Sequence, residues 1–193
     1  MSRSTSDPGK SQSELRNDAR TMRSALEPAY RAAASAKIAE KIFHAHWFSR
    51  AENIACYLSV GAEVDSWPVI ARAWQMGKRI FAPVVQENMS MQFREITIET
   101  DLAGTSFGLY EPLSGALISP RKLDIVITPL VAFDRKMNRV GMGGGCFDRT
   151  FAFLRNQKSY RHPKLIGIAF ACQEVEKIDA NAWDIPLFQV LTD

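Results

Sequence analysis

The segment LDIVITPL at residues 123–130, followed by the glycine-rich segment GMGGG at 141–145, is the strongest indication of the fold class. A short and almost wholly apolar run is typical of a β-strand that is buried on both faces of a sheet. Four glycines in five positions then indicate a tight turn after the strand. A helix is expected over residues 147–154, so this part of the chain has the strand, turn and helix of an α/β unit.

The same alternation of helices and strands runs through the rest of the chain. Apolar positions at helical spacing predict two helices near the N-terminus, on the stripes Leu15, Ala19, Met22 and Leu26, and Ala34, Ile38 and Ile42. A third helix is expected over residues 69–74, capped by Asp65 or Ser66 and ended by Gly77. Further strands are expected at 54–60, 79–85, 91–96, 164–170 and 188–191, with Pro83 at a strand end or a sheet edge. We therefore predict a three-layer αβα sandwich, with a mainly parallel sheet and helices on both faces.

The composition predicts one globular domain. The chain has 193 residues, 46% of them hydrophobic, and a formal net charge of +3. We expect a flexible segment at 1–12 and a single domain at 13–193, as a monomer or weak dimer. The charge is too small to indicate nucleic-acid binding, and no apolar run has the roughly 18 residues of a membrane span.

The first residues and the cysteines predict where the protein works. The polar start lacks the apolar core of a secretory signal. Cys56, Cys146 and Cys172 are odd in number and far apart, which fits neither a disulfide framework nor a paired metal site. We therefore expect a reduced, cytoplasmic protein.

The glycine cluster is the best candidate for a binding site. Exposed backbone N–H groups before a helix attract anions, so phosphate is the expected ligand. The cluster matches neither the GxxxxGK[ST] phosphate loop nor the dinucleotide pattern GxGxxG, because no Lys-Ser or Lys-Thr follows it and Cys146 takes the last glycine position. From the residues alone, a flexible turn without a ligand remains the alternative.

The segment around the glycine cluster resembles the signature of the 5-formyltetrahydrofolate cyclo-ligase family, which is roughly PxxxFDxxxxRxGxGxGYYD. The chain has Pro129, Phe133 and Asp134, followed by NRVGMGGGCFD at 138–148. Other segments are similar to the family in order and spacing: LS at 58–59 with EVD at 63–65, FGLYEP at 107–112 and WDIPL at 183–187. The resemblance extends from about residue 15 to the C-terminus.

The resemblance implies a fold like that of sugar-phosphate isomerases and CoA transferases, and an ATP- and Mg²⁺-dependent reaction on a reduced folate. In that reaction the formyl oxygen of 5-formyltetrahydrofolate is phosphorylated and N10 attacks the activated carbon. The products are 5,10-methenyltetrahydrofolate, ADP and phosphate. Such chemistry needs a triphosphate cradle, cations and a pocket for the pterin.

The family motifs assign site residues position by position, and no catalytic residue among them. The implied ATP contacts are Gln12, Arg16, Arg139, Val140, Gly141, Met142, Gly143, Gly144, Gly145, Cys146 and Phe147. The implied folate contacts are Leu58, Glu63, Phe107, Met142, Gly143, Gly144, Gly145 and Cys146. The implied Mg²⁺ contacts are Asp148 and Asp184.

Several of these residues also have a structural interpretation. Asp148 is favourably placed in a first helical turn, Asp184 is a turn former, and Phe107 is equally explained by core packing. Arg20 and Arg23 share a helix face with Arg16, and for these two a solvated face is the favoured interpretation.

The chain departs from the family pattern at two places that concern the nucleotide. Cys146 and Phe147 stand where the signature has two tyrosines, and Gln12 stands where the family has a lysine, for which Lys10 is an alternative cation. These departures leave a binding module without turnover as a second hypothesis. A phosphosugar enzyme is a third, although no residue in the sequence suggests the base that it would need.

Overall fold

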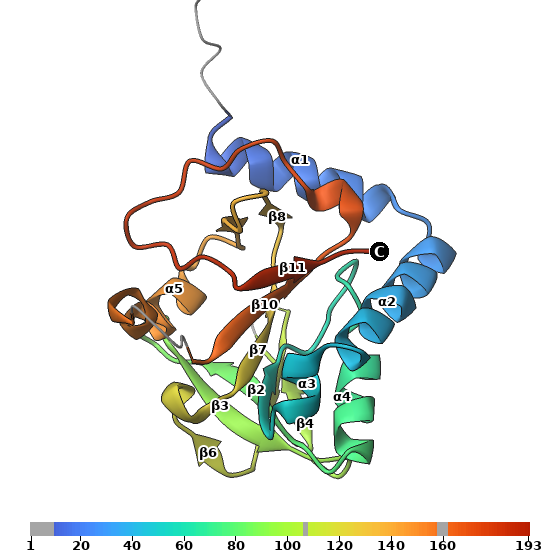
Figure 1. The fold of residues 1–193 in the computed structure, drawn as a ribbon, viewed down its shortest axis with the longest axis vertical. Coiled ribbons are helices and arrows are strands. Elements are labelled where there is room, and N and C mark those ends of the chain that lie inside the picture. Colours follow the sequence, from blue (N-terminus) through green and yellow to red (C-terminus); the bar gives the residue numbers. More distant parts are fainter. Residues whose placement is uncertain (1–9, 106–107, 158–161) are drawn as a thin grey trace, which may run out of the picture.

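A mainly parallel sheet forms the centre of the computed structural model, which describes residues 10–105, 108–157 and 162–193 (Figure 1). Within the described residues the seven strands have the order β11-β10-β7-β1-β2-β3-β6. They are β1 (Asn53–Cys56), β2 (Arg79–Val85), β3 (Met91–Ile96), β6 (Leu117–Ile118), β7 (Ile125–Pro129), β10 (Lys164–Ile168) and β11 (Gln189–Leu191). The pairs from β11 to β2 are parallel, whereas β3 and β6 pair antiparallel at one edge. The predicted α/β class is confirmed.

Helices cover both faces of this sheet, as Figure 1 shows with α2, α3 and α4 on one side and α5 on the other. The helices are α1 (Gln12–Ala25), α2 (Pro28–Phe43), α3 (His46–Arg50), α4 (Trp67–Gln75) and α5 (Cys146–Thr150). Short 3₁₀ turns are η1 (Pro120–Lys122), η2 (Ala152–Asn156) and η3 (Ala171–Gln173). Two small ribbons pair β4 (Leu102–Gly104) with β5 (Tyr110–Pro112) and β8 (Ala132–Phe133) with β9 (Arg139–Val140). None of the helices in the described part of the chain has both the length and the apolar character that crossing a bilayer requires.

The buried strands divide their side chains between two cores. Ile125 and Ile127 of β7 belong to the cluster with α2 and α4, whereas Val126 belongs to the cluster with Phe151 and Leu154. Successive side chains of a strand point to opposite faces, so a strand covered on both sides must be apolar at every position. This is why the run at 123–130 indicated the fold.

Strand β1 is shorter than the predicted 54–60, because the chain turns back after Cys56. The Tyr57 hydroxyl donates to the Val64 carbonyl oxygen at 2.6 Å, and the Ser66 hydroxyl donates to the Tyr57 carbonyl oxygen at 2.7 Å. Ser66 is therefore not free to cap α4 with its side chain, and the Asp65 carboxylate accepts the Trp67 N–H instead. These bonds fold residues 57–66 into a loop beyond the strand.

Helix α1 buries a different stripe from the predicted one. Its buried residues are Leu15, Ala19 and Arg23, while Met22 is 43% exposed. A capping box between Ser11 and Glu14 starts the helix, which lies on β8, β9 and η3. The expected burial of Met22 was wrong. The surface of β8, β9 and η3 contacts the residues spaced i, i+4 and i+8 along the helix, which places Arg23 inside in place of Met22.

Pro83 agrees with the expected edge position, whereas the helix after the glycine cluster differs from the expected one. Strand β1 pairs only with residues 79–81 of β2, so Pro83 has just β3 beside it, as at a sheet edge. The expected helix at 147–154 is split into α5 and η2 at Phe151.

Replacing Gly167 with alanine is expected to lower the free energy of unfolding by about 1–3 kcal/mol, because the methyl group would overpack the core. The new Cβ would lie 2.7 Å from Leu187 Cδ1 and 2.8 Å from Leu130 Cδ2. Chemical denaturation measures the change. Gly104→Ala is the matched control, since no heavy atom lies within 4 Å of its Cβ position. Equal stability of the two variants would show that the core accommodates the methyl group.

Candidate functional site

A cavity of about 640 Å³ opens where β1, β2 and β7 end. Tyr57 follows β1, Val85 ends β2, and Leu130 follows β7, and all three line the cavity. The chain passes from β1 to β2 on one side and later from β7 to β10 on the other. Ligands of open α/β sheets bind at the carboxyl ends of the strands where the order reverses in this way. The fold thus points to this cavity as the functional site.

Most of the residues assigned from the sequence line this one cavity. They are Gln12, Arg16, Leu58, Glu63, Arg139, Gly141, Met142, Gly143, Gly144, Gly145, Cys146, Phe147, Asp148 and Asp184. Val140 is not among the lining residues, because it pairs with Ala132 in the β8–β9 ribbon and its side chain is buried. Phe107 lies outside the described residues.

The glycine loop presents backbone donors to the cavity. Residues 142–145 are exposed, and their backbone N–H groups make no hydrogen bond to the described protein. Gly143 has a φ of +103° and Gly145 a φ of +65°, conformations that L side chains rarely adopt. Helix α5 has only five residues, so its dipole adds less to anion binding than the predicted longer helix would. The free N–H groups are the main attraction that this loop offers an anion.

Arg16 of α1 reaches the glycine loop from the other side. Its Nε donates to the Gly141 carbonyl oxygen at 2.7 Å. A Cβ built on Gly143 would lie 3.8 Å from Arg16 Cζ, so the guanidinium lies over the loop. The rest of the guanidinium fork makes no hydrogen bond to the described residues and can bind a phosphate oxygen.

Gln12 and Lys10, the two candidates for the lysine position of the family motif, make hydrogen bonds away from the glycine loop. Gln12 Nε2 donates to the Asp179 carbonyl oxygen at 3.2 Å, which ties the start of α1 to the loop before Asp184. Lys10 forms an exposed ion pair with Asp18 at 2.6 Å and does not line the cavity. In this structure Lys10 therefore does not replace the missing lysine of the family motif.

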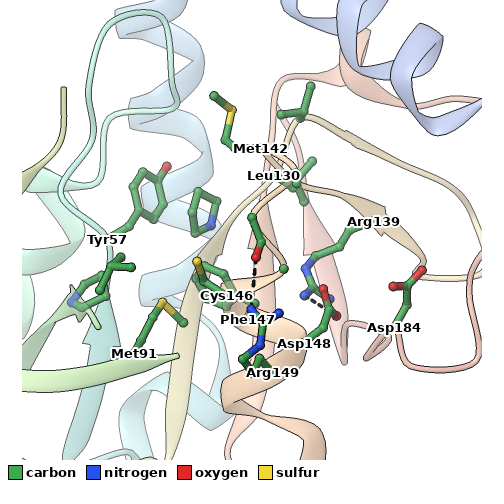
Figure 2. Close-up of a pocket in the computed structure, with 18 of the residues that line it drawn as sticks. Tyr57, Met91, Leu130, Arg139, Met142, Cys146, Phe147, Asp148, Arg149 and Asp184 are labelled. Carbon is green, nitrogen blue, oxygen red and sulfur yellow. Dashed lines mark hydrogen bonds and ion pairs between the residues drawn. The ribbon is translucent and has the colours of Figure 1, made fainter. Parts of the chain in front are cut away.

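Arg139, an expected phosphate contact, is paired within the protein. Its Nη2 donates to Asp148 Oδ1 at 2.8 Å, and its Nη1 donates to the Ile185 carbonyl oxygen. The Arg139 side chain is only 5% exposed, and its guanidinium lies over the Phe147 ring. Figure 2 shows this ion pair on the same side of the cavity as Asp184. Arg139 thus holds the glycine loop, α5 and the C-terminal segment together.

Asp148 and Asp184 each keep one oxygen without a hydrogen bond in the described structure. Asp148 Oδ1 accepts from the Ile185 N–H at 2.9 Å as well as from Arg139. Asp184 Oδ2 accepts from the Asn181 N–H at 2.8 Å. The described residues contain no cluster of three or more metal-ligating side chains. Two carboxylates fit a Mg²⁺ ion that is completed by water and phosphate oxygens, and do not form a cage of protein ligands alone.

Tyr57 and Met91 lie on the other side of the cavity, across from Asp148 and Asp184 (Figure 2). Glu63 belongs to the loop after Tyr57, and its Oε2 accepts the Val60 N–H at 3.1 Å. Burial raises the pKa of the Glu63 carboxyl, while the Val60 N–H and the positive charge of Arg23 oppose this rise. Leu58 beside it is buried. A carboxylate and apolar side chains at this end suit a flat ring that carries N–H donors.

Sequence reasoning missed several lining residues. Among them are Tyr57, Met91, Glu111, Arg149, Arg155 and Trp183. Trp183 and Glu111 lie within the motifs WDIPL and FGLYEP, so the motif matches could have identified them as site residues. Trp183 is 60% exposed, and Glu111 Oε1 accepts the Val85 N–H at 2.8 Å. Tyr57 and Met91 carry no sequence signal and reach the cavity through the fold alone.

Comparisons with known proteins show the family of the chain. The model of the 5-formyltetrahydrofolate cyclo-ligase family matches residues 8–193. A Haemophilus influenzae protein named 5-formyltetrahydrofolate cyclo-ligase is 34% identical over 182 residues, covering 92% of this chain and 95% of that protein. A protein of the same name from Escherichia coli is 37% identical over 146 residues, covering 74% and 78%. The NMR structure of Aquifex aeolicus 5,10-methenyltetrahydrofolate synthetase is similar with a TM-score of 0.79 and 28% identity, covering 93% of this chain and 88% of that one.

Proposed function

Because this chain belongs to the 5-formyltetrahydrofolate cyclo-ligase family and is a ligase, we propose that it converts 5-formyltetrahydrofolate into 5,10-methenyltetrahydrofolate with Mg-ATP. The observation that carries the proposal is that the two ends of one cavity offer different chemical groups. One end has the free N–H groups of residues 142–145 under Arg16, and the other has Glu63 beside Leu58 and Tyr57. The first suits a triphosphate and the second a pterin.

The proposed reaction needs the two substrates side by side. The N5-formyl group is an amide, and its oxygen is a poor leaving group. In the first step this oxygen therefore accepts the γ-phosphoryl group of ATP, and ADP is released. N10 then attacks the formyl carbon and loses its proton to solvent, and the C–O bond breaks to release phosphate. The nitrogen must meet the carbon before water does, so the cavity gains rate by holding both groups in line.

The glycine loop and Arg16 are proposed to hold the triphosphate. Backbone N–H donors and a guanidinium fork stabilise the negative charge that develops on the transferred group. Asp148 and Asp184 would hold Mg²⁺, which neutralises charge on the phosphates. Arg139 fixes Asp148 in place through their ion pair of 2.8 Å.

Glu63 is proposed to accept N–H bonds from the pterin. This contact orients the ring and disfavours ligands that lack those donors. Met142 is 62% exposed at the cavity and supplies apolar contact beside the glycines. A cytoplasmic location and a monomer or weak dimer stay predictions from the sequence.

Purified protein with 5-formyltetrahydrofolate is expected to form the methenyl product, detected by its near-ultraviolet absorbance, only when Mg-ATP is present. Binding of folate or ATP without product would favour a module that has lost turnover, which the Cys146 and Gln12 departures suggest. Binding of sugar phosphates with indifference to ATP would favour the phosphosugar enzyme. Either result would overturn the proposed ligase reaction.

A further inference from the structure

Asp134 is a buried carboxylate that lies within the family motif but does not line the cavity. The residue is 1% exposed, and no ion pair joins it to another described residue. Removing a carboxylate from water is costly, so a group of this kind is stable only where N–H donors replace the lost water. The donors around Asp134 therefore show which parts of the chain its charge holds together.

The Asp134 carboxylate accepts four hydrogen bonds. Its Oδ1 accepts from the backbone N–H groups of Lys136 at 2.9 Å and Asn138 at 3.0 Å. Its Oδ2 accepts from Asn138 Nδ2 at 2.9 Å and from the Ile178 N–H at 3.0 Å. These bonds fill the capacity of the two oxygens. An amide at this position would place an NH2 group against two of the donors, so a carboxylate fits here and an amide does not.

The Oδ1 bonds close the turn between β8 and β9. In this turn the Met137 N–H donates to the Asp134 carbonyl oxygen at 3.0 Å. Met137 has a φ of +65°, which an L residue rarely adopts. Its own carbonyl oxygen accepts the Leu187 N–H at 2.9 Å. The turn that Asp134 shapes thus presents a backbone acceptor to the segment just after Asp184.

The Oδ2 bond fixes Ile178, which precedes Asp184 by six residues. The Ile178 side chain is buried in one cluster with residues of α1 and of the β8–β9 ribbon. Asn181 and Asp184 follow and line the cavity. Asn181 orients the second of these, because its N–H donates to Asp184 Oδ2 at 2.8 Å. The chain from Ile178 onward therefore connects Asp134 to the position of the Asp184 carboxylate.

Few other bonds hold this part of the chain. After Asp184, the Ile185 N–H ties the chain to α5. Residues 176–184 themselves make two hydrogen bonds to the rest of the described chain. One is the exposed bond from Gln12, and the other is the bond to Asp134, which is buried. Water competes less for a buried bond, so Asp134 has the larger part in fixing these residues.

We propose that Asp134 is a positioning residue, whose carboxylate fixes the Ile178 side of this loop and thereby the place of Asp184 in the cavity. This statement concerns the folded chain alone. That the place of Asp184 matters for Mg²⁺ rests on the proposed function. Replacing a residue that orients a metal ligand typically changes metal affinity or activity by about 10- to 100-fold.

Amide hydrogen exchange of the whole protein without ligands tests the proposal directly. Asp134→Asn is expected to speed exchange of the Ile178 and Leu187 N–H groups by at least about tenfold relative to the amides of β7, because the Ile178 N–H then faces an NH2 group and the turn loosens. The amides of β7 report the loss of global stability. An increase at Ile178 no larger than the increase in β7 would overturn the proposal.

Asp124→Asn is the matched control. The Asp124 carboxylate also accepts two backbone N–H groups, those of Glu52 at 2.9 Å and Asn53 at 2.8 Å, and it does not line the cavity. This variant loses the same charge and is expected to leave the exchange of Ile178 relative to β7 as in the wild type.

The paired change Asp134→Asn with Asn138→Asp separates the turn from the bond to Ile178. It keeps the net charge, and the new amide can donate to the new carboxylate, so the turn and the protection of Leu187 should recover. The Ile178 N–H still faces an NH2 group and should stay fast in exchange. If Asp134→Asn alone does not fold, the pair gives the same test. Wild-type protection of Ile178 in either folded variant would overturn the proposal.

The kinetic test depends on the proposed function. Asp134→Asn is expected to raise the Mg²⁺ concentration for half-maximal turnover by about tenfold, and to leave the KM for 5-formyltetrahydrofolate within about twofold. A merely structural role would lower the amount of active protein, and hence the apparent kcat, without changing the Mg²⁺ dependence. In an Asp184→Asn background the same change should have no further effect on the Mg²⁺ dependence.

The outcomes of the two tests are distinguishable. Fast exchange of Ile178 with an unchanged Mg²⁺ dependence in an active enzyme would overturn the link from Asp134 to the function of Asp184. A wild-type protein without turnover would contradict the proposed function, while hydrogen exchange would still decide whether Asp134 fixes the loop.

Discussion

Replacing Asp148 with alanine is expected to lower turnover by at least about 100-fold and the free energy of unfolding by roughly 3 kcal/mol. The alanine removes a proposed Mg²⁺ ligand and leaves the buried guanidinium of Arg139 without its ion-pair partner. It also removes the acceptor of the Ile185 N–H, so the C-terminal segment loses a tie to α5. Single-turnover kinetics at several Mg²⁺ concentrations and chemical denaturation measure the two effects.

Asp148→Asn separates the chemical effect from the structural one. Its amide oxygen can still accept from Arg139 Nη2 and the Ile185 N–H, so we expect the domain to stay folded. Turnover should still fall and need more Mg²⁺, because the negative charge is gone. Asp184→Asn is the matched control for metal binding without the ion pair, since among the described residues the Asp184 carboxylate accepts hydrogen bonds only from Asn181. Wild-type kinetics of Asp148→Asn would remove the metal role of Asp148.

The central sheet could be predicted because its strands have nearly continuous apolar sequences. Val126 and Ile127 must face different cores, and only a strand covered on both sides needs this pattern. The position of the site followed from the same fact, since the glycine cluster comes after β7 and meets the ends of neighbouring strands. Motif matches then assigned lining residues as distant as Gln12 and Asp184.

Pairing between distant residues could not be predicted. Arg139 has the same sequence signal whether its guanidinium faces phosphate or Asp148, and the bond to Ile185 depends on where residues 181–187 cross the cavity. The burial of Arg23 in place of Met22 depends on the surface that β8, β9 and η3 offer to α1. Such choices are made by tertiary packing, which overrides a helical stripe of apolar residues.

Arg16→Met is expected to raise the KM for ATP by about 10- to 100-fold, because one or two charge-assisted hydrogen bonds to the triphosphate are lost. The KM for the folate should change far less, since the proposed folate contact, Glu63, lines the other end of the cavity. Arg16→Lys is expected to recover only part of the loss. A single ammonium cannot bond the Gly141 carbonyl oxygen at 2.7 Å, as Arg16 Nε does, and also present a fork to phosphate. Steady-state kinetics with each substrate varied in turn measure these changes.

Arg20→Met is the control that tests whether Arg16 acts through its position and not through the charge of α1. Both variants remove one positive charge from the same helix, but Arg20 is exposed and does not line the cavity. Long-range attraction of ATP would fall equally in both and would be screened by salt. A local contact predicts a large change for Arg16→Met alone, which persists at high ionic strength. Equal effects of the two substitutions would mean that the free N–H groups of residues 142–145 hold the triphosphate without a guanidinium above them.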